Sequence, residues 1–283
     1  MMRQDSEGRM KTLYVTDLDG TLLKSDEMIS EFSLQVINKL TASGTLFSYA
    51  TARSLSSAVV VTKGLELNVP VVIYNGVFLV NPKTGEQMAE NTFCADEMKE
   101  VVQFLTEQEI SPLVYSFVNG EEKVSWLAGS ENEGMRHYLS NRRGDRRLRE
   151  ISDRKELYAG EVFYFTCIGT KERLAPVYAR FRNDPHYNVI FQQELYRNEF
   201  WCEMMPKNAT KANALLQLKK ILGCDRLVTF GDRINDLPMF EISDECYAVE
   251  NAVSELKEKA TGIIRSNDAD GVARWMEAEV RRQ

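Results

Sequence analysis

Short apolar runs alternate with longer segments of helical periodicity in the first 74 residues of this 283-residue chain, and the alternation returns after residue 208. Strands that alternate with helices at this spacing indicate a parallel sheet covered by helices. Near-continuous apolar runs such as residues 69–74 suit strands buried on both faces of the sheet. We therefore expect an α/β core. Its strands are expected at residues 11–16, 45–49, 69–74, 226–230, 246–249 and 262–264, and its helices at residues 30–43, 54–67, 210–222, 235–242, 253–260 and from residue 270.

A different pattern fills residues 83–200. Two β-rich runs flank Asn119-Gly120, a dipeptide that favours a tight turn between antiparallel strands. We expect an inserted α+β domain at residues 83–200, a core at residues 11–82 and 201–283, and a flexible N-terminal extension at residues 1–10. Strands of the insertion are expected at residues 112–118, 122–127, 161–168, 188–193 and 198–204, and helices at residues 97–107, 131–141 and 172–183.

The charge balance limits the possible partners. The chain carries 35 Lys and Arg against 42 Asp and Glu, a net charge of -7. General affinity for nucleic acid needs an excess of basic residues, so the basic run at residues 142–149 is expected to be a solvated loop or helix end. The longest apolar stretch, residues 69–80, is too short for a membrane span, and residues 1–10 lack the apolar centre of a signal peptide. We expect neither a nucleic-acid nor a membrane partner.

Cysteine and histidine are sparse. None of the five cysteines forms a Cys-x-x-Cys pair, which argues against a zinc site or disulfide framework and fits a reducing cytoplasm. The two histidines, His137 and His186, are too few for chemistry that needs several histidine ligands. Catalysis is therefore expected to depend on carboxylates.

The sequence Asp-Leu-Asp-Gly-Thr at residues 17–21 directly follows an apolar run. Asp17 therefore stands at the carboxyl end of an expected parallel strand, where open α/β sheets place their sites. Asp17 and Asp19 are two residues apart, so extended backbone turns both carboxylates to one side, and Gly20 permits a sharp turn. Close carboxylates repel unless a cation or proton lies between them, and oxygen-rich sites suit Mg²⁺. A solvated acidic turn is the simpler alternative, which the complete motif disfavours.

A second acidic motif, Gly-Asp-Arg-Ile-Asn-Asp at residues 231–236, also follows an apolar run. Asn235 can cap the following helix and Asp236 suits its first turn, so helix capping alone would explain these two residues. It does not explain Asp232, which stands at another expected strand end. The motif therefore indicates a second contribution to the same edge of the sheet.

Two weaker features lie between the acidic motifs. Thr51-Ala52-Arg53 follows the expected strand at residues 45–49, and Lys211 stands near the start of an expected helix. A hydroxyl, backbone amides and a cation at strand and helix ends can together hold a phosphate. Each alone is more often structural or simply solvated.

In this order the features resemble the haloacid dehalogenase superfamily, specifically its Cof-type, type IIB sugar-phosphatase branch. DLDGTLL at residues 17–23 is highly specific, GDRIND at residues 231–236 resembles GDxxND, and ATAR at residues 50–53 resembles ATGR. Further signatures of the branch match Asn75-Gly76, Asn251-Ala252 and Asn267 with Gly271-Val272. The resemblance implies a Rossmann-like parallel core with an inserted α/β cap domain of type C2B, and a Mg²⁺-dependent phosphatase acting on a small phosphorylated metabolite, with a sugar phosphate favoured.

The resemblance also implies roles for individual residues. Asp17 would be the nucleophile and a Mg²⁺ ligand, and Asp19 the general acid and base, which adds its backbone carbonyl to the metal. Asp232 would be the remaining protein ligand, supported by Asp236. The phosphoryl group would be held by Thr51, the amides of Leu18 and Ala52, Lys211 and Asn235.

The sequence departs from the family pattern at two positions. Ala52 replaces a more frequent Gly and would be strained if its φ were positive. Arg233 stands where a small residue is common, and it is expected to point to solvent rather than to add charge near the phosphate.

Two other functions remain open. A phosphomutase on the same core would need a bisphosphate activator. A non-catalytic binding protein would usually lack one of the acidic residues, and none is missing here. The oligomeric state has no signal in the sequence.

Overall fold

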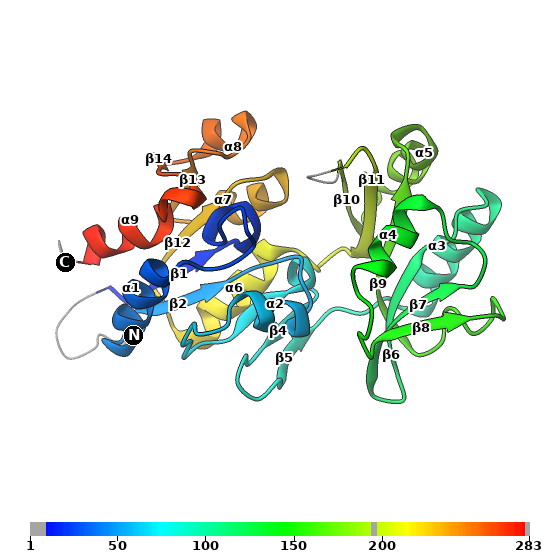
Figure 1. Cartoon of the computed structure of the whole chain (residues 1–283), viewed down its shortest axis with the longest axis horizontal. Coiled ribbons are helices and arrows are strands. Elements are labelled where there is room, and N and C mark those ends of the chain that lie inside the picture. The colour runs from blue at the N-terminus through cyan, green and yellow to red at the C-terminus, as the bar shows by residue number, and fades with distance from the viewer. Residues whose placement is uncertain (1–9, 194–196, 281–283) are drawn as a thin grey trace. The chain divides into compact units, whose positions relative to one another are not determined.

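The computed structural model describes residues 10–193 and 197–280, so nearly all of the expected N-terminal extension, residues 1–10, lies outside the described residues. The chain divides into two compact units (Figure 1). The core unit runs up to Glu90 and resumes at Thr210, and the inserted unit is Asn91–Ala209. These limits lie slightly beyond the expected 83 and 200, because β5 (Gln87–Glu90) still pairs with β4 (Phe78–Val80) and β11 (Phe200–Pro206) still pairs within the inserted sheet.

The core unit is built on a parallel sheet with strand order β14-β13-β12-β1-β2. Its apolar strands are buried, as Leu13 and Val15 in β1 illustrate with no exposed surface. Because β1 lies between β12 and β2, the ends of these three strands come together at one edge. The strands are β1 (Thr12–Thr16), β2 (Leu46–Tyr49), β12 (Arg226–Gly231), β13 (Glu245–Val249) and β14 (Gly262–Ile264).

Three helices of the core unit, α1, α2 and α6, directly follow residues that cap them. Ser30, Ser54 and Thr210 each accept a backbone N–H of the following first turn with their side-chain oxygen. The α helices are α1 (Glu31–Ala42), α2 (Leu55–Val61), α6 (Lys211–Leu222), α7 (Leu237–Glu241), α8 (Ser254–Lys259) and α9 (Gly271–Val280). Short helical turns occur at η1 (Leu18–Leu22), η2 (Tyr74–Gly76), η3 (Ile234–Asp236) and η4 (Asn267–Ala269).

The expected strand at residues 69–74 is shorter and lies elsewhere. β3 (Val71–Ile73) belongs to a separate three-stranded sheet, β3-β4-β5, with antiparallel pairing. Its link to the parallel edge is one bridge between Ala50 and Val72. This bridge is parallel, as expected of the strand, but its antiparallel pairing with β4 was not expected, because a buried apolar run has the same pattern whichever direction its partner runs.

The inserted unit contains a sheet with strand order β10-β11-β9-β6-β7-β8, which is antiparallel except for the β7–β8 pair. Apolar residues of α3 and α5, such as Leu105 and Phe181, form one core with Phe165 and Cys202 of the sheet. The elements are α3 (Ala95–Glu107), β6 (Leu113–Val118), β7 (Glu121–Leu127), α4 (Glu133–Ser140), β8 (Leu148–Ile151), β9 (Glu161–Gly169), α5 (Lys171–Phe181), β10 (Tyr187–Gln193) and β11.

The basic run at residues 142–149 is not wholly a loop or helix end, since its last two residues begin β8. Arg147 is half-buried and pairs with Glu122 at 2.7 Å and Asp145 at 2.6 Å. The unexpected strand exists because Val124 of β7 provides a parallel partner for Leu148. None of the helices in the described part of the chain has the length and apolarity of a membrane span.

Candidate active site

Three neighbouring strands end at the predicted site residues. Asp17 follows β1, Thr51 comes two residues after β2, and Asp232 follows β12. Because the sheet order is β12-β1-β2 and these strands are parallel, the three residues share the carboxyl edge of the sheet. Polar residues therefore lie together at this edge of the core unit, as the sequence predicted.

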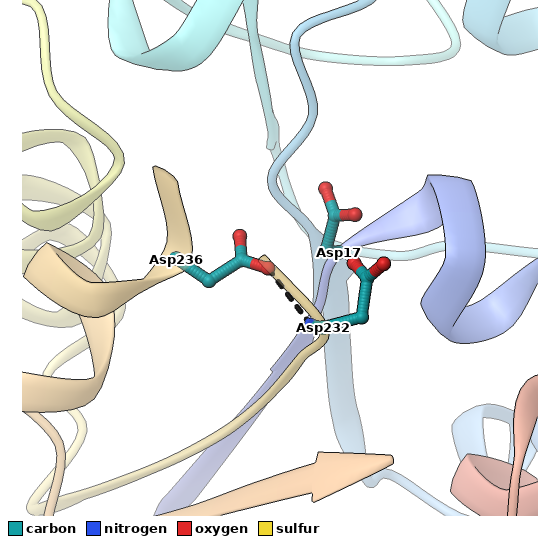
Figure 2. Close-up of side chains that lie close together, drawn as sticks. All are labelled: Asp17, Asp232 and Asp236. Carbon is teal, nitrogen blue, oxygen red and sulfur yellow. Dashed lines mark hydrogen bonds between the residues drawn. The ribbon is translucent and has the colours of Figure 1, made fainter. Parts of the chain in front are cut away.

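Three carboxyl groups converge at this edge. Asp17, Asp232 and Asp236 each offer an oxygen within 4.8 Å of the others, and all three residues are buried. Figure 2 shows the carboxyl groups of Asp17 and Asp232 pointing to the same side, beyond the ends of their strands. Asp236 lies against the backbone, where one of its oxygens accepts the amide N–H of Asp232 at 3.0 Å and of Arg233 at 3.2 Å.

Lys211 neutralises part of this charge. Its ammonium lies 2.6 Å from Asp17 Oδ1 and 2.7 Å from Asp236 Oδ1, and only 2% of the residue is exposed. Thr210 caps α6 and fixes the turn from which the lysine extends. Both oxygens of Asp236 are therefore engaged, one by Lys211 and the other by backbone amides, which leaves Asp17 and Asp232 as the more available carboxylates.

The electrostatics of the cluster favour a further cation. Burial raises the pKa of Asp17 well above its usual value, although Lys211 opposes the shift. Burial and the nearby Asp236 raise the pKa of Asp232 to about 7. Burial alone would lower the pKa of Lys211, but Asp17 and Asp236 outweigh burial and raise it. A buried set of oxygen donors that is short of positive charge fits a hard divalent cation such as Mg²⁺.

Gly20 and Thr21 fit closely against Asp232. Gly20 has a φ of 77°, and a Cβ there would lie 2.3 Å from Asp232 Oδ2. The predicted sharp turn at Gly20 is thus present. The close approach of Asp232 to this backbone is a second reason why glycine is needed here. Thr21 donates its hydroxyl to Asp232 Oδ1 at 3.1 Å. No role was predicted for Thr21 from the sequence, although its place in the motif was visible.

Asp19 is not part of the group of three close carboxyl groups found among the described residues. Its side chain, 37% exposed, pairs with Arg53, whose Nε lies 2.8 Å from Asp19 Oδ2. Arg53 also donates to Glu27 at 2.9 Å. No specific partner was predicted for Arg53 from the sequence, where its position in the ATAR stretch was the available signal.

The remaining predicted phosphate contacts lie at the same edge of the core unit. Thr51 has no exposed surface, and its hydroxyl oxygen accepts the amide N–H of Arg53 at 3.1 Å. Ala52 is not among the residues with positive φ, so the possible strain at this position does not arise. Asn235 has a buried Oδ1 for which the described residues supply no hydrogen-bond partner. This oxygen is an acceptor and is therefore available to a hydrogen-bond donor of a ligand.

Arg233 was expected to point to solvent, but it is turned toward Asp232. Its side chain is 27% exposed, and its Nε lies 3.5 Å from Asp232 Oδ2. The attraction of a buried carboxylate explains this orientation, since the hydroxyl of Thr21 and the charge of Lys211 offset only part of the charge of Asp232.

Comparison with known proteins places these features in a family. A family model described as haloacid dehalogenase-like hydrolase matches residues 14–276. A 5-amino-6-(5-phospho-D-ribitylamino)uracil phosphatase of Bacillus subtilis is 27% identical over 267 residues, covering 93% of this chain and 96% of the relative. A putative phosphatase of Streptococcus pyogenes is 27% identical over 276 residues, covering 92% of this chain and 95% of the relative.

Solved structures share the fold. A haloacid dehalogenase-like hydrolase from Bacteroides thetaiotaomicron has a TM-score of 0.78 at 24% identity, over 96% of this chain and 100% of the other. A protein from Thermotoga maritima has a TM-score of 0.76 at 25% identity, over 95% and 97% of the two chains. These likenesses confirm the expected α/β fold with a parallel core and a further, largely antiparallel part.

Proposed function

Since the chain belongs to the family of haloacid dehalogenase-like hydrolases, of the Cof type that its motifs resemble, we propose that it is a Mg²⁺-dependent phosphatase that hydrolyses a small phosphorylated metabolite through an aspartyl-phosphate on Asp17. The observation that supports this most is the setting of Asp17. It lies buried at a strand end, paired with Lys211 and close to Asp232.

Asp17 is the nucleophile in this proposal. Its free oxygen attacks the phosphorus in line while Lys211, which already pairs with Asp17 Oδ1, offsets the charge of the equatorial oxygens. The hydroxyl of Thr51, the amides of Leu18 and Ala52 and the side chain of Asn235 hold those oxygens.

Asp19 is the general acid and base. It protonates the leaving alcohol and then takes a proton from the water that hydrolyses the aspartyl-phosphate. Its carboxyl group is anchored by Arg53, so that the proton is transferred from a fixed position.

The metal ligands in this proposal are Asp17, Asp232 and the backbone carbonyl of Asp19, while Asp236 positions Asp232 through its amide. The ligands fit Mg²⁺ because all are oxygens and two are buried carboxylates. When bound, Mg²⁺ would neutralise these carboxylates and polarise the phosphoryl group.

The substrate is proposed to be a phosphate ester of a sugar or polyol. Two relatives from Bacillus subtilis, 27% and 25% identical, are named as phosphatases of a phosphoribitylaminouracil, whose organic part includes a ribityl chain. The core residues address only phosphate and metal, which are common to all phosphomonoesters. We therefore assign discrimination among substrates to the inserted unit, acting as a cap domain.

The deciding experiment assays the purified protein against a panel of phosphorylated metabolites and p-nitrophenyl phosphate, with Mg²⁺ and after exhaustive chelation. Asp17→Asn is the test variant, and Asp225→Asn, at the opposite end of the sheet, is the matched control. We expect phosphate release that requires Mg²⁺, survives in the control and is lost with Asp17→Asn. Full activity after chelation would refute the metal, and an active Asp17→Asn would refute the nucleophile. A requirement for a bisphosphate activator would identify a phosphomutase instead.

A further inference from the structure

An asparagine from the far end of the sequence holds the loop that follows Asp19. Asn251 donates from Nδ2 to the carbonyl oxygen of Gly20 at 2.7 Å, across 231 residues of sequence. Its Oδ1 accepts the amide N–H of Asn267 at 3.1 Å. Because the oxygen is committed to Asn267, the nitrogen of the same amide group is directed at Gly20.

Residues near Asn267 also form hydrogen bonds with the part of the chain that follows this loop. Asn267 donates from Nδ2 to the carbonyl oxygen of Leu23 at 2.9 Å, in a buried hydrogen bond. Asp268 accepts the amide N–H and the hydroxyl of Ser25, at 2.9 and 2.7 Å. The segment around η4 therefore holds the chain at Leu23 and again at Ser25.

This loop needs external support because it lacks a regular backbone. Within η1, Asp19 and Gly20 have non-helical φ and ψ, and Gly20 is left-handed. The loop carries Asp19 on one side of Gly20 and Thr21, the hydrogen-bond partner of Asp232, on the other. A peptide rotation at Gly20 would displace both.

We propose that Asn251 is a positioning residue: its hydrogen bond to the Gly20 carbonyl keeps Asp19 and the Gly20–Thr21 peptide in place for proton transfer. Asn267 supports this role, because its hydrogen bond orients the side-chain amide of Asn251. The inference rests on the proposed function, because it takes Asp19 as the general acid.

A second bridging asparagine in the core unit, Asn38, serves as a control for Asn251. Asn38 in α1 makes the same two-sided bridge: its Nδ2 donates to the carbonyl oxygen of Gly64 at 2.8 Å, and its Oδ1 accepts the amide N–H of Glu66 at 2.8 Å. This bridge joins segments that carry no proposed site residue. A loss that is peculiar to Asn251 therefore reports on the loop that holds Asp19, and not on the removal of a bridging asparagine in general.

The test compares Asn251→Ala, the isosteric Asn251→Asp and Asn38→Ala with the native protein, on glycerol phosphate and on p-nitrophenyl phosphate. Misplacing a catalytic group by about 1 Å costs up to roughly 10²-fold, so we expect both Asn251 variants to lose roughly tenfold or more in kcat on glycerol phosphate. The loss should be smaller on p-nitrophenyl phosphate, whose leaving group needs little protonation, with KM unchanged within about twofold. Asn38→Ala should match the native protein.

Amide hydrogen exchange of the resting proteins provides a readout that needs no turnover. Exchange in residues 18–25 should accelerate in the Asn251 variants and not in Asn38→Ala. Equal kcat in the Asn251 variants and the control, or an equal loss on both esters, overturns the positioning role while leaving the phosphatase intact. A native protein that hydrolyses neither ester nor any member of the metabolite panel overturns the proposed function, and the role of Asn251 with it.

Discussion

Arg53 donates hydrogen bonds to both carboxylate oxygens of Asp19, from Nε to Oδ2 at 2.8 Å and from Nη2 to Oδ1 at 2.5 Å. A planar guanidinium that meets both oxygens of a carboxylate fixes its direction as well as its charge. With Asp19 as the acid, this pair sets the direction from which the proton reaches the leaving group.

Replacing Arg53 should therefore impair proton transfer. We expect Arg53→Met to lower kcat by roughly tenfold to 10²-fold on alkyl phosphates, within the range for general acid catalysis, and by less on p-nitrophenyl phosphate. Arg53→Lys should recover little, because an ammonium cannot make the two-point contact. Steady-state kinetics on both esters measures the difference.

Arg226→Met is the control, since Arg226 also forms a half-buried pair, with Glu245, at the opposite end of the sheet. If Arg53→Met and Arg226→Met reduced activity equally on both esters, the Arg53 pair would have only a structural role.

The position of most site residues followed from the sequence because it depends on local pattern and sheet topology. Asp17, Thr51 and Asp232 each follow an apolar strand, and parallel strands bring their carboxyl ends to one edge. Helix starts were predictable within one to a few residues for a similar reason, as Ser30 and Thr210 cap the turns directly after them.

Pairings between distant segments could not be predicted in the same way. Asn251 and Gly20 are 231 residues apart, and Arg53 and Asp19 are 34 apart. No periodicity encodes such contacts, because they depend on how the loops at the strand ends meet. The antiparallel pairing of β3 was missed for the same reason.

The buried lysine should be essential to the stability of the metal-free core. Lys211→Met would leave Asp17 and Asp236 buried without their shared partner, and breaking a buried ion pair costs about 3–5 kcal/mol. Urea unfolding without Mg²⁺ measures this loss, and added Mg²⁺ should recover part of it by binding the folded state.

Lys219→Met provides the comparison from the same helix, since Lys219 pairs with Asp244 near the surface at 3.1 Å. An exposed pair of this kind contributes about 1 kcal/mol or less. Equal losses in the two variants would show that the Lys211 pairs are no more important than a surface contact.

The burial of Glu203 in β11 should make the stability of the inserted unit depend on pH. It is 7% exposed and accepts a hydrogen bond from Tyr164 at 2.8 Å. Burial raises the pKa of Glu203 from 4.5 to about 7, although the bond from Tyr164 opposes the shift. Its contribution to stability is therefore fully present below pH 4.5 and is lost as the pH rises through about 7.

Glu203→Gln removes this titration. Its free energy of unfolding should exceed that of the native protein increasingly from pH 5 to pH 8, by on the order of 3 kcal/mol at most, since each pKa unit corresponds to about 1.4 kcal/mol. Denaturant unfolding across this pH range tests the prediction, with Glu161→Gln at the exposed start of β9 as the control. A constant difference between Glu203→Gln and native protein across the range would contradict it.

Arg233 should compete with the metal for Asp232. Its Nε lies 3.5 Å from Asp232 Oδ2, on a carboxylate that the proposed Mg²⁺ would share. Because Arg233 is partly exposed, its attraction to Asp232 is worth at most about 1 kcal/mol, so Arg233→Ala should tighten Mg²⁺ binding by roughly twofold to fivefold. Isothermal titration calorimetry without substrate measures this directly. Arg226→Ala, which removes the same charge from the far end of β12, should leave the affinity unchanged within about twofold. Weaker binding by Arg233→Ala would instead mean that the arginine holds Asp232 in the orientation that the metal needs.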